Sequence, residues 1–317
     1  MEIIPLESGH IEAAAEMFVG KLRGLRETVP ALPETMLDPQ RAAALLEKRA
    51  RAGAGLAAVE DGRLVGYLSW FVVEQFRDTD RTGAYCPEWA HGARPEGAAR
   101  IYRGLYRAAA QRWQAAGCGV HTLTLLAHEE AAREVWFWNG FGLGVVDAIR
   151  WTEPLAADAQ GGLAQRRAGA GDARILAEIE AEHWRHYAAP PVQMTAGAPN
   201  TEEEFAALLA DKNFHAWLAL EGETAAAYLR LQSRSHGAAS IVAAEDAIAI
   251  TGAFTRPAYR GRKLAPALLS ATIEDARARG FRRMSVDFES FNPEAAAFWP
   301  RYFAPVCFSV MRIPERT

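Results

Sequence analysis

The feature that most constrains the fold of this chain is a repeat of its sequence pattern in a second half. Three matched pairs of residues carry the repeat, each at nearly the same spacing: the predicted hairpin-turn glycines Gly62 and Gly222, 160 residues apart, the helix tryptophans Trp136 and Trp299, 163 apart, and the last-strand arginines Arg150 and Arg312, 162 apart. Three matched features at one period predict an internal duplication.

The two halves join at residues 154–162, PLAADAQGG, which have the composition of a linker. A chain of 317 residues suits two domains of about 150 residues each. Half of the residues are hydrophobic, which is enough for two cores. We therefore predict domains at residues 1–154 and 162–317, the second repeating the plan of the first.

Each half predicts alternating strands and helices of an α/β fold. The first half predicts strands at 2–6, 85–92, 120–127 and 141–150, a hairpin at 55–71 turning at Asp61-Gly62, and helices at 10–26, 40–51, 96–116 and 129–139. The second half predicts a strand at 163–167, a helix at 172–187, a hairpin at 214–232, and a helix that begins at a Thr201–Glu204 capping box.

The stretch 247–269, AIAITGAFTRPAYRGRKLAPALL, predicts a strand, a basic loop and a helix. Proline is tolerated only in the first helical turn, so Pro266 indicates that the helix begins shortly before it. The unpaired amides of that helix start, its dipole and the cations Arg260, Arg262 and Lys263 suit a polyanion such as a pyrophosphate. A basic, solvated helix start is the alternative interpretation.

Downstream, VDFESFNPEAAAFWPRYF predicts a strand at 285–288, a break at Asn292-Pro293 and a short helix. In this order of elements the sequence resembles the GNAT acyltransferase family. The family's phosphate-loop pattern is matched at Arg260, Arg262 and Ala265, whereas Lys263 stands where the family usually has its middle glycine. The family's Asn-x-x-Ala element is matched by Asn292 and Ala295.

The resemblance implies two tandem GNAT-like folds of the α/β class, each a mixed, mostly antiparallel twisted sheet flanked by helices. It also implies acetyl-CoA as the acyl donor and no metal. The expected cofactor-binding residues are Phe254, Thr255, Arg260, Gly261, Arg262, Lys263, Leu264, Ala265, Asn292, Ala295, Phe298 and Trp299.

The first half departs from the family where the phosphate loop belongs. Only Arg94, Gly97 and Arg100 are similar to an anion loop, and the family's spacing is absent. We interpret this half as a degenerate GNAT-like domain that binds no acyl-CoA. Its expected role is either to form a wall of the acceptor site or to stabilise the second half. The alternative is that the first half binds a second ligand near Trp89 and His91. The simpler role for Trp89 is packing between the halves.

The family transfers an acyl group from coenzyme A to an amine by direct attack. An amine with a pKa of ~10.4 is deprotonated in about 1 molecule of 2,500 at pH 7, equivalent to ~4.6 kcal/mol, so a base is useful. Asp287 and Glu289 lie two apart, hence on one face of a strand, and are the candidate bases; solvated carboxylates are the alternative.

Many family members place a tyrosine seven residues after the asparagine to protonate the leaving thiolate. Trp299 occupies that position, and an indole N–H cannot give up its proton. Tyr302, one turn further, is the candidate acid, with a packing role as the alternative. Loss of this acid costs only ~2 kcal/mol for a thiol of pKa ~8.5. Strand amides near Phe254 and Thr255 are expected to polarise the carbonyl.

The predicted function is therefore an N-acetyltransferase acting on a small-molecule or peptide amine. The alternative, which Lys263 and Trp299 keep open, is a binding or regulatory protein that retains the fold without turnover. The acceptor and the oligomeric state, monomer or dimer, stay open.

Other patterns exclude competing classes. A net charge of −4 and a pI near 6.1 disfavour nucleic-acid and membrane-surface partners. A cytoplasmic location is expected, because no targeting or spanning segment is found. Three scattered cysteines indicate neither disulfides nor a zinc site. His183 and His186 are interpreted as surface histidines rather than metal ligands, and His236 as a solvated loop residue.

Overall fold

A computed structural model describes residues 1–155, 162–195 and 197–315 of the chain. The chain forms two compact units. Unit 1 contains Met1–Asp147, Ala239–Val242 and the chain from Ala304 onward, and unit 2 contains Ala148–Ala238 and Ala243–Phe303. Most of the linker predicted at 154–162 lies outside the described residues.

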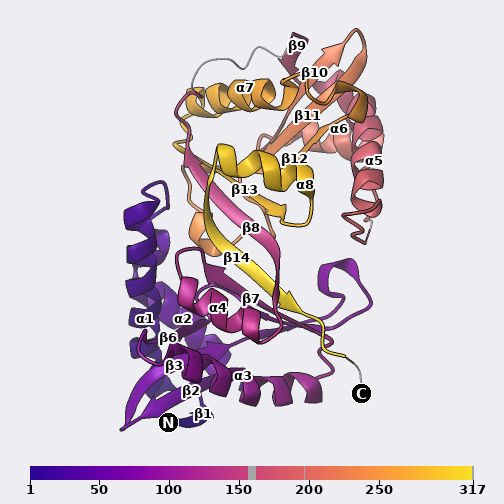
Figure 1. The fold of residues 1–317 in the computed structure, drawn as a ribbon. Coiled ribbons are helices and arrows are strands. Elements are labelled where there is room, and N and C mark those ends of the chain that lie inside the picture. The colour runs from indigo at the N-terminus through magenta and orange to yellow at the C-terminus, as the bar shows by residue number, and fades with distance from the viewer. Residues whose placement is uncertain (156–161, 196, 316–317) are drawn as a thin grey trace. The chain divides into compact units, whose positions relative to one another are not determined.

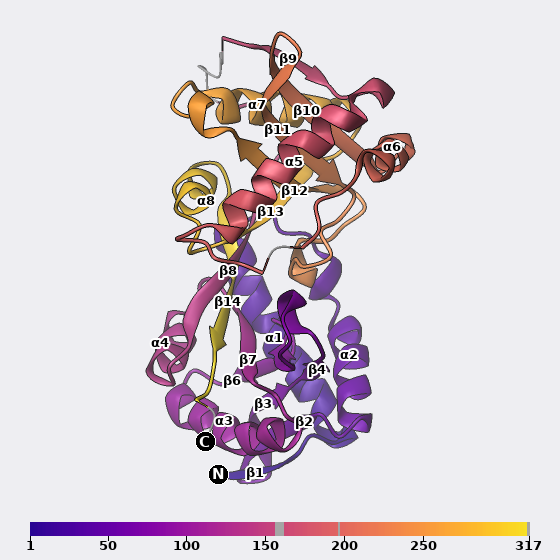
Figure 2. The same ribbon diagram turned by 90° about the vertical axis from the view of Figure 1, so that its right-hand side faces the viewer.

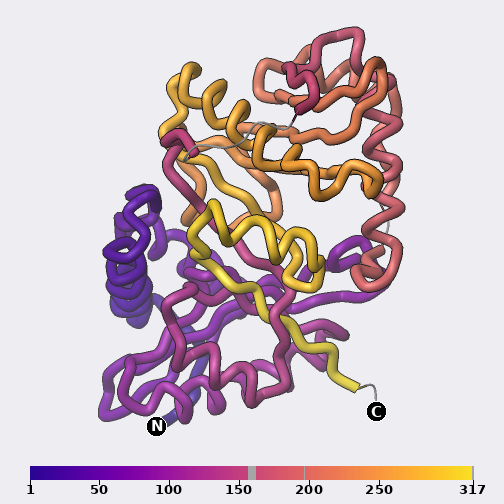
Figure 3. The backbone as a smooth tube through the Cα atoms, turned by 45° about the horizontal axis from the view of Figure 1, so that its top comes forward, coloured from indigo at the N-terminus to yellow at the C-terminus, as the bar shows by residue number. Residues whose placement is uncertain are grey.

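The units interleave in sequence, whereas the prediction of domains 1–154 and 162–317 divides the chain at a single point. Strand β14 (Ala304–Arg312) follows the second half in sequence but pairs antiparallel with β7 (Val120–Leu126) in unit 1 (Figure 3). Strand β8 (Gly142–Trp151) has residues in both units. A strand belongs to the unit whose strands it pairs with, even when it is distant from them in sequence. A linker in the sequence therefore does not mark the whole boundary between the units.

Unit 1 holds the elements of the first half together with β14. Its helices are α1 (Ser8–Thr28), α2 (Pro39–Arg51), α3 (Ala98–Ala115) and α4 (Glu130–Trp138), and its remaining strands are β1 (Glu2–Pro5), β2 (Gly55–Glu60), β3 (Arg63–Ser69), β4 (Phe71–Val73), β5 (Gly83–Cys86) and β6 (His91–Ala93). The strand orders are β1-β2-β3-β6 in one sheet and β4-β5-β7-β14-β8 in the other. Figure 1 shows β7, β14 and β8 of the second sheet side by side.

One strand predicted in this half is wrong. The stretch 85–92 forms the end of β5 and the start of β6, which belong to different sheets: β5 pairs parallel with β7, and β6 pairs antiparallel with β3. Pro87 lies between them and lacks the N–H that a continuous ladder needs. The chain therefore leaves one sheet and enters the other at this proline.

Unit 2 repeats the α/β plan in the strand order β8-β13-β12-β11-β10-β9. Its elements are β9 (Ala164–Arg167), α5 (Ala173–Ala188), α6 (Glu202–Ala210), β10 (Phe214–Glu221), β11 (Thr224–Gln232), β12 (Ala247–Thr255), α7 (Leu264–Ala278), β13 (Arg283–Glu289) and α8 (Pro293–Phe298). Within it α5 covers one face of the strands and α7 the other (Figure 2). Within unit 2, β12 pairs parallel with β13, whereas β10 pairs antiparallel with β9 and with β11, and β11 pairs antiparallel with β12.

The local signals in the sequence are confirmed. Asp61 and Gly62 both have positive φ, 50° and 73°, as a two-residue hairpin of type I′ requires. The Thr201 hydroxyl accepts from the Glu204 N–H at 3.2 Å, and the Glu204 carboxylate accepts from the Thr201 N–H at 2.7 Å. The capping box therefore begins α6 as predicted.

The duplication extends to the backbone at the start of the third helix of each half. The Arg94 N–H donates to the Val65 carbonyl, and the Arg256 N–H donates to the Ala226 carbonyl, each at 2.9 Å. The N-cap residues of α3 and α7, Gly97 and Lys263, are both left-handed, with φ 74° and 58°. The two halves differ between these points, because the loop of the second half is four residues longer.

Candidate functional site

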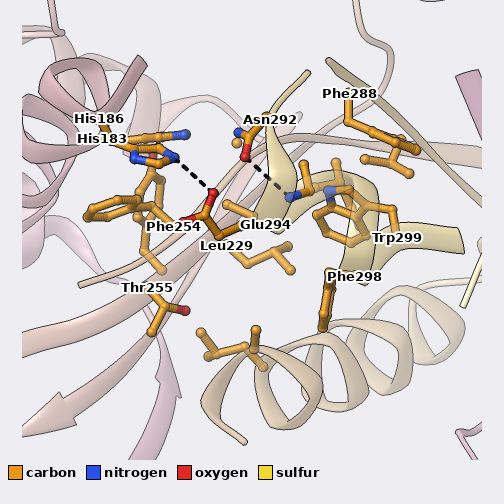
Figure 4. A pocket seen from close by; sticks show the side chains of 18 of the residues that line it. His183, His186, Leu229, Phe254, Thr255, Phe288, Asn292, Glu294, Phe298 and Trp299 are labelled. Atoms are coloured by element: carbon orange, nitrogen blue, oxygen red, sulfur yellow. Dashed lines mark hydrogen bonds and ion pairs between the residues drawn. The ribbon is translucent and has the colours of Figure 1, made fainter. Parts of the chain in front are cut away.

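A cavity of about 650 Å³ lies within unit 2, where β12 and β13 separate. The two strands pair in parallel from Ala247↔Arg283 to Ile250↔Val286 and then diverge, although each continues for several residues. Figure 4 shows side chains that line this gap, with His183, His186 and Phe254 on one side and Asn292, Phe298 and Trp299 on the other. A split in the sheet thus creates the site.

Strand β12 offers unpaired backbone donors to the gap. Because the Arg256 N–H donates to the Ala226 carbonyl of β11, alternation along the strand directs the N–H groups of Ala253 and Thr255 away from β11, toward the gap. The amide of Phe254 therefore points to β11, so among the strand amides near Phe254 and Thr255 that are expected to polarise a carbonyl, those of Ala253 and Thr255 face the gap. The side chain of Phe254 still lines the cavity.

The start of α7 presents a run of backbone donors, as the sequence predicts. The Arg260 N–H donates to the Pro257 carbonyl, and the Ala267 N–H donates to the Lys263 carbonyl. Between them, the amides of residues 261–265 have no acceptor in the part of the chain that the structure describes, and Pro266 has no N–H. Such a helix start binds anions through these amides and through the helix dipole.

The loop cations differ in how they are held. The Arg260 guanidinium pairs with the Glu294 carboxylate and donates through Nε to the Thr255 carbonyl at 3.3 Å. Arg262 donates to Glu221 at 3.4 Å, with its guanidinium 5.1 Å from the ring centre of Tyr259. Lys263 is exposed and has no ion pair among the described residues.

All the residues predicted to bind the cofactor line the cavity except Arg262. Lys263, the departure from the family pattern, is left-handed at the N-cap position, a conformation that glycine adopts without strain. The lysine therefore keeps the backbone shape of the loop and adds a positive charge to it.

The start of α8 closes the opposite wall. The Asn292 carboxamide oxygen caps the helix by accepting from the Ala295 N–H at 3.3 Å. Trp299 is buried and lines the cavity, but Tyr302, the candidate acid, does not line it. Its ring packs on Phe298 at 5.0 Å instead. The helix changes to a 3₁₀ turn at Trp299, so Tyr302 does not follow on the face that α-helical spacing predicts.

Asp287 and Glu289 both line the cavity at the end of β13, so the structure brings the two candidate bases to the gap. The ideal Cβ position at Gly237 lies 3.9 Å from Asp287 Oδ2, which places the loop after β11 close to this carboxylate. His236, in that loop, is exposed as expected and does not line the cavity.

The prediction that His183 is a surface residue is wrong. It is 6% exposed, its Nδ1 is 2.8 Å from the Tyr228 hydroxyl, and its ring stacks on Phe254 at 5.2 Å. Burial, with the nearby charges of Arg230 and His186, lowers the pKa of His183 to about 3. His183 is therefore a neutral part of the cavity wall at neutral pH.

The sequence interpretation also missed a buried ion pair. Glu180 of α5 pairs with Arg230 of β11, and both line the cavity. The sequence does indicate the burial of Glu180, because Leu176, Ile179, Glu180 and His183 follow the i, i+3, i+4, i+7 spacing of a buried helix face, but it does not indicate the partner on β11. His186, on the same helix, lies 3.8 Å from the Glu294 carboxylate.

The corresponding region of unit 1 is filled by its own side chains. Lys21 of α1 forms a 2.5 Å ion pair with Glu129 and donates to the Tyr102 hydroxyl at 3.2 Å. His91 Nε2 lies 2.8 Å from the Thr124 carbonyl oxygen, which joins β6 to β7 across the two sheets. Burial lowers the pKa of His91 to about 4. The contact of His91 with Thr124 thus connects β6 and β7, which flank α3 in the chain as β12 and β13 flank α7 in unit 2.

Trp89, the possible ligand neighbour in the first half, is buried and packs edge-on against Phe71 at 6.0 Å. This contact favours the packing interpretation. The three cysteines are buried thiols. Within the described residues no group of three or more His, Cys, Asp or Glu side chains is arranged to hold a metal. The helices described for residues 1–155, 162–195 and 197–315 include none that is long and apolar enough to cross a membrane.

A split sheet beside a helix start with unpaired amides defines an α/β protein whose cavity suits an anionic ligand. Comparison with known families identifies the class further: residues 176–303 match the Acetyltransferase (GNAT) family. The match lies in the second half of the chain and does not extend to the first half. No curated protein matches the sequence.

Solved structures resemble the chain at low identity. A GCN5-related N-acetyltransferase from Sphaerobacter thermophilus is 12% identical, with a TM-score of 0.57 over 99% of this chain and 96% of that one. This likeness shows a common fold over almost the whole chain. A tandem GNAT protein from the clavulanic acid biosynthesis pathway is 14% identical over 100% and 99% of the two chains, with a TM-score of 0.45. A GCN5-related N-acetyltransferase from Kribbella flavida is 14% identical over 98% and 70%, with a TM-score of 0.40.

Proposed function

We propose that unit 2 binds acetyl-CoA and transfers its acetyl group to an amine by direct attack. The observation that carries this proposal is the run of unpaired amides at residues 261–265 beside the gap between β12 and β13. Backbone donors at a helix start suit the pyrophosphate of the donor, and the gap gives its thioester arm a path through the sheet.

The reacting carbonyl would lie against β12. The N–H groups of Ala253 and Thr255 point into the gap, and either is suited to stabilise the oxyanion that forms when the amine attacks. These donors are fixed by the pairing of β12 with β11, so they need no reorganisation during the reaction.

Two carboxylates are suited to receive the proton that the acceptor's ammonium group must lose before its neutral amine can attack. Asp287 and Glu289 line the cavity on one face of β13. Because an amine of pKa ~10.4 must lose a proton at a cost of ~4.6 kcal/mol at pH 7, a base near the gap is worth more to the rate than an acid for the thiolate. The position of Tyr302 outside the cavity fits this order of importance.

Two measurements test the proposal in sequence. Thermal-shift titration with acetyl-CoA detects binding, and release of free thiol in the presence of a panel of amines detects transfer. Binding with amine-dependent thiol release supports an N-acetyltransferase. Binding without release from any amine supports the non-catalytic alternative, and absence of binding refutes the assignment.

A matched pair of variants tests where the donor binds. Arg260 lines the cavity and Arg262 does not, although both are arginines of the same loop. We expect Arg260→Gln to weaken acetyl-CoA affinity about tenfold, since charge-assisted bonds to phosphate contribute ~1.5–3 kcal/mol. Arg262→Gln, which lies outside the cavity and is engaged with Glu221, should change it less than about twofold. Equal effects of the two variants would contradict this location.

A further inference from the structure

The cavity contains a guanidinium that is fixed from two sides. Nε of Arg230 donates to the Thr251 carbonyl at 3.1 Å, and Nη1 pairs with the Glu180 carboxylate. Glu180 is 1% exposed, and its second oxygen accepts from the Asn200 N–H at 3.0 Å. Both oxygens of the carboxylate are therefore engaged, and Glu180 acts as a holder of the arginine.

The remaining terminal nitrogen of Arg230, Nη2, has no acceptor among the residues that the structure describes. Nη2 is also accessible to solvent, since it is not one of the fully buried side-chain nitrogens that lack a partner. The Arg230 side chain as a whole is 20% exposed. Since Arg230 lines the cavity, this exposed donor is available to a molecule bound there. A guanidinium with its other nitrogens already paired loses little freedom when it binds an acceptor.

Arg230 lies on the α5 side of the sheet. It is two residues from Tyr228 on β11, so their side chains share a face, and Tyr228 contacts His183 of α5. A Cβ at Gly252 would lie 2.5 Å from Arg230 Nε, so the glycine allows the guanidinium to lie against β12. In the proposed function, the donor binds to the amides at the start of α7, the helix that covers the other face. Arg230 therefore belongs to the acceptor end of the cavity.

We propose that Arg230 determines specificity by binding a carboxylate of the acceptor, so that the substrate is an amino acid or another amine that carries a carboxylate. This inference rests on the proposed acetyl transfer. An ionised oxygen gains a charge-assisted hydrogen bond from Nη2, whereas an acceptor without an oxygen there leaves that nitrogen desolvated and unpaired. The amine of the same molecule would approach the gap, where Asp287 and Glu289 lie.

Pairs of acceptors that differ only in the carboxylate test this inference. Each amino acid is compared with its decarboxylated amine and with its C-terminal amide by thiol release at saturating acetyl-CoA. We expect kcat/KM to be about tenfold or more higher for the amino acid, because the decarboxylated amine and the amide lose the charge-assisted hydrogen bond to Arg230.

Variants then attribute the preference to Arg230. Substitution of the arginine alone leaves Glu180 buried and unpaired, so the main variant is the double change Glu180→Gln and Arg230→Gln, which keeps a neutral pair of similar size. We expect it to abolish the carboxylate preference while acetyl-CoA affinity changes less than about twofold. Arg256→Gln is the matched control, because Arg256 pairs with Glu182 of the same helix but does not line the cavity. It should keep the preference.

The outcomes separate the two proposals. If the protein binds no acetyl-CoA and releases no thiol with any amine, the proposed function fails and the inference with it. If it acetylates amines equally well with and without a carboxylate, or if the preference survives in the double variant, the function stands and the role of Arg230 is overturned. A preference that disappears in the double variant and persists in Arg256→Gln supports it.

Discussion

Lys263 shows how one residue separates backbone shape from charge. Its φ of 58° is a left-handed conformation in which a side chain costs ~1–2 kcal/mol relative to glycine. A glycine would remove this cost, but it would also increase the conformational entropy of the unfolded chain, which lowers stability by ~0.4–1 kcal/mol. We therefore expect Lys263→Gly to raise the free energy of unfolding by about 0.5 kcal/mol, measured as a higher urea midpoint at an unchanged m-value. Arg262→Gly, at a neighbouring position without positive φ, should lower stability.

His183 makes stability depend on pH. Its pKa is about 3 in the folded protein and ~6.5 in the unfolded chain, so the unfolded chain binds the proton first as pH falls. The stabilisation is present above pH ~6.5 and is lost progressively toward pH 3, by about 2 kcal/mol at pH 5.

His183→Gln should therefore shrink the difference in free energy of unfolding between pH 7 and pH 5 by about 2 kcal/mol. Chemical denaturation at the two pH values measures this difference. The exposed loop residue His236 provides the control, since His236→Gln should leave the difference as in the unmodified protein. An unaltered pH difference in His183→Gln would show that other buried groups govern it.

The loop before α7 is the element in which the two halves differ most clearly. Both halves have an arginine whose N–H pairs with the preceding strand and a left-handed residue at the helix N-cap, but unit 2 has seven residues from Pro257 to Lys263 where unit 1 has only Pro95, Glu96 and Gly97. The extra residues carry Arg260 and two of the unpaired amides.

Replacing residues 257–263 by the sequence Pro-Glu-Gly of unit 1 should therefore leave α7 in place while removing the donor site. We expect thermal unfolding to stay cooperative and acetyl-CoA to give no stabilisation, because the stabilisation requires binding to the folded state. The measurement is a thermal-shift titration. A shortened variant that still binds acetyl-CoA would show that the loop is not the anchor of the donor.

Elements were predictable from sequence where the signal is local. The turn at Asp61-Gly62, the Thr201–Glu204 capping box and the start of α7 near Pro266 depend on residues a few positions apart, and all are confirmed. The division of 85–92 between two sheets and the pairing of Glu180 with Arg230 depend on residues distant in sequence. No local pattern in the sequence specifies such contacts.

At the scale of the whole chain, the two halves differ in what lies between the strands that flank their third helix. The ion pair of Lys21 with Glu129 and the contact of His91 with the Thr124 carbonyl fill the region of unit 1 that corresponds to the gap of unit 2. Buried, mutually paired polar groups are costly to separate, so a ligand would have to replace several interactions at once. This arrangement fits the interpretation that the first half binds no acyl-CoA.

The last strand of the chain belongs to unit 1, so we expect the first half to be unstable without it. Strand β14 pairs with β7 over six residues, from Cys307↔Leu126 to Arg312↔His121, and buries Val306, Cys307 and Val310 in unit 1. Burial of a valine contributes ~1.5 kcal/mol or more, and a typical domain is stable by only ~5–15 kcal/mol. A fragment of residues 1–154 lacks this strand and exposes the edge of β7.

We therefore expect the fragment 1–154 to unfold without cooperativity or to aggregate when it is expressed alone, and the full chain without residues 304–317 to lose the unfolding transition of unit 1. Deletion of residues 313–317 alone is the control, since it keeps β14 whole and should preserve both transitions. Circular dichroism during thermal unfolding and limited proteolysis measure the result. A cooperatively folded fragment 1–154 would show that the first half is complete without the strand that the second half supplies.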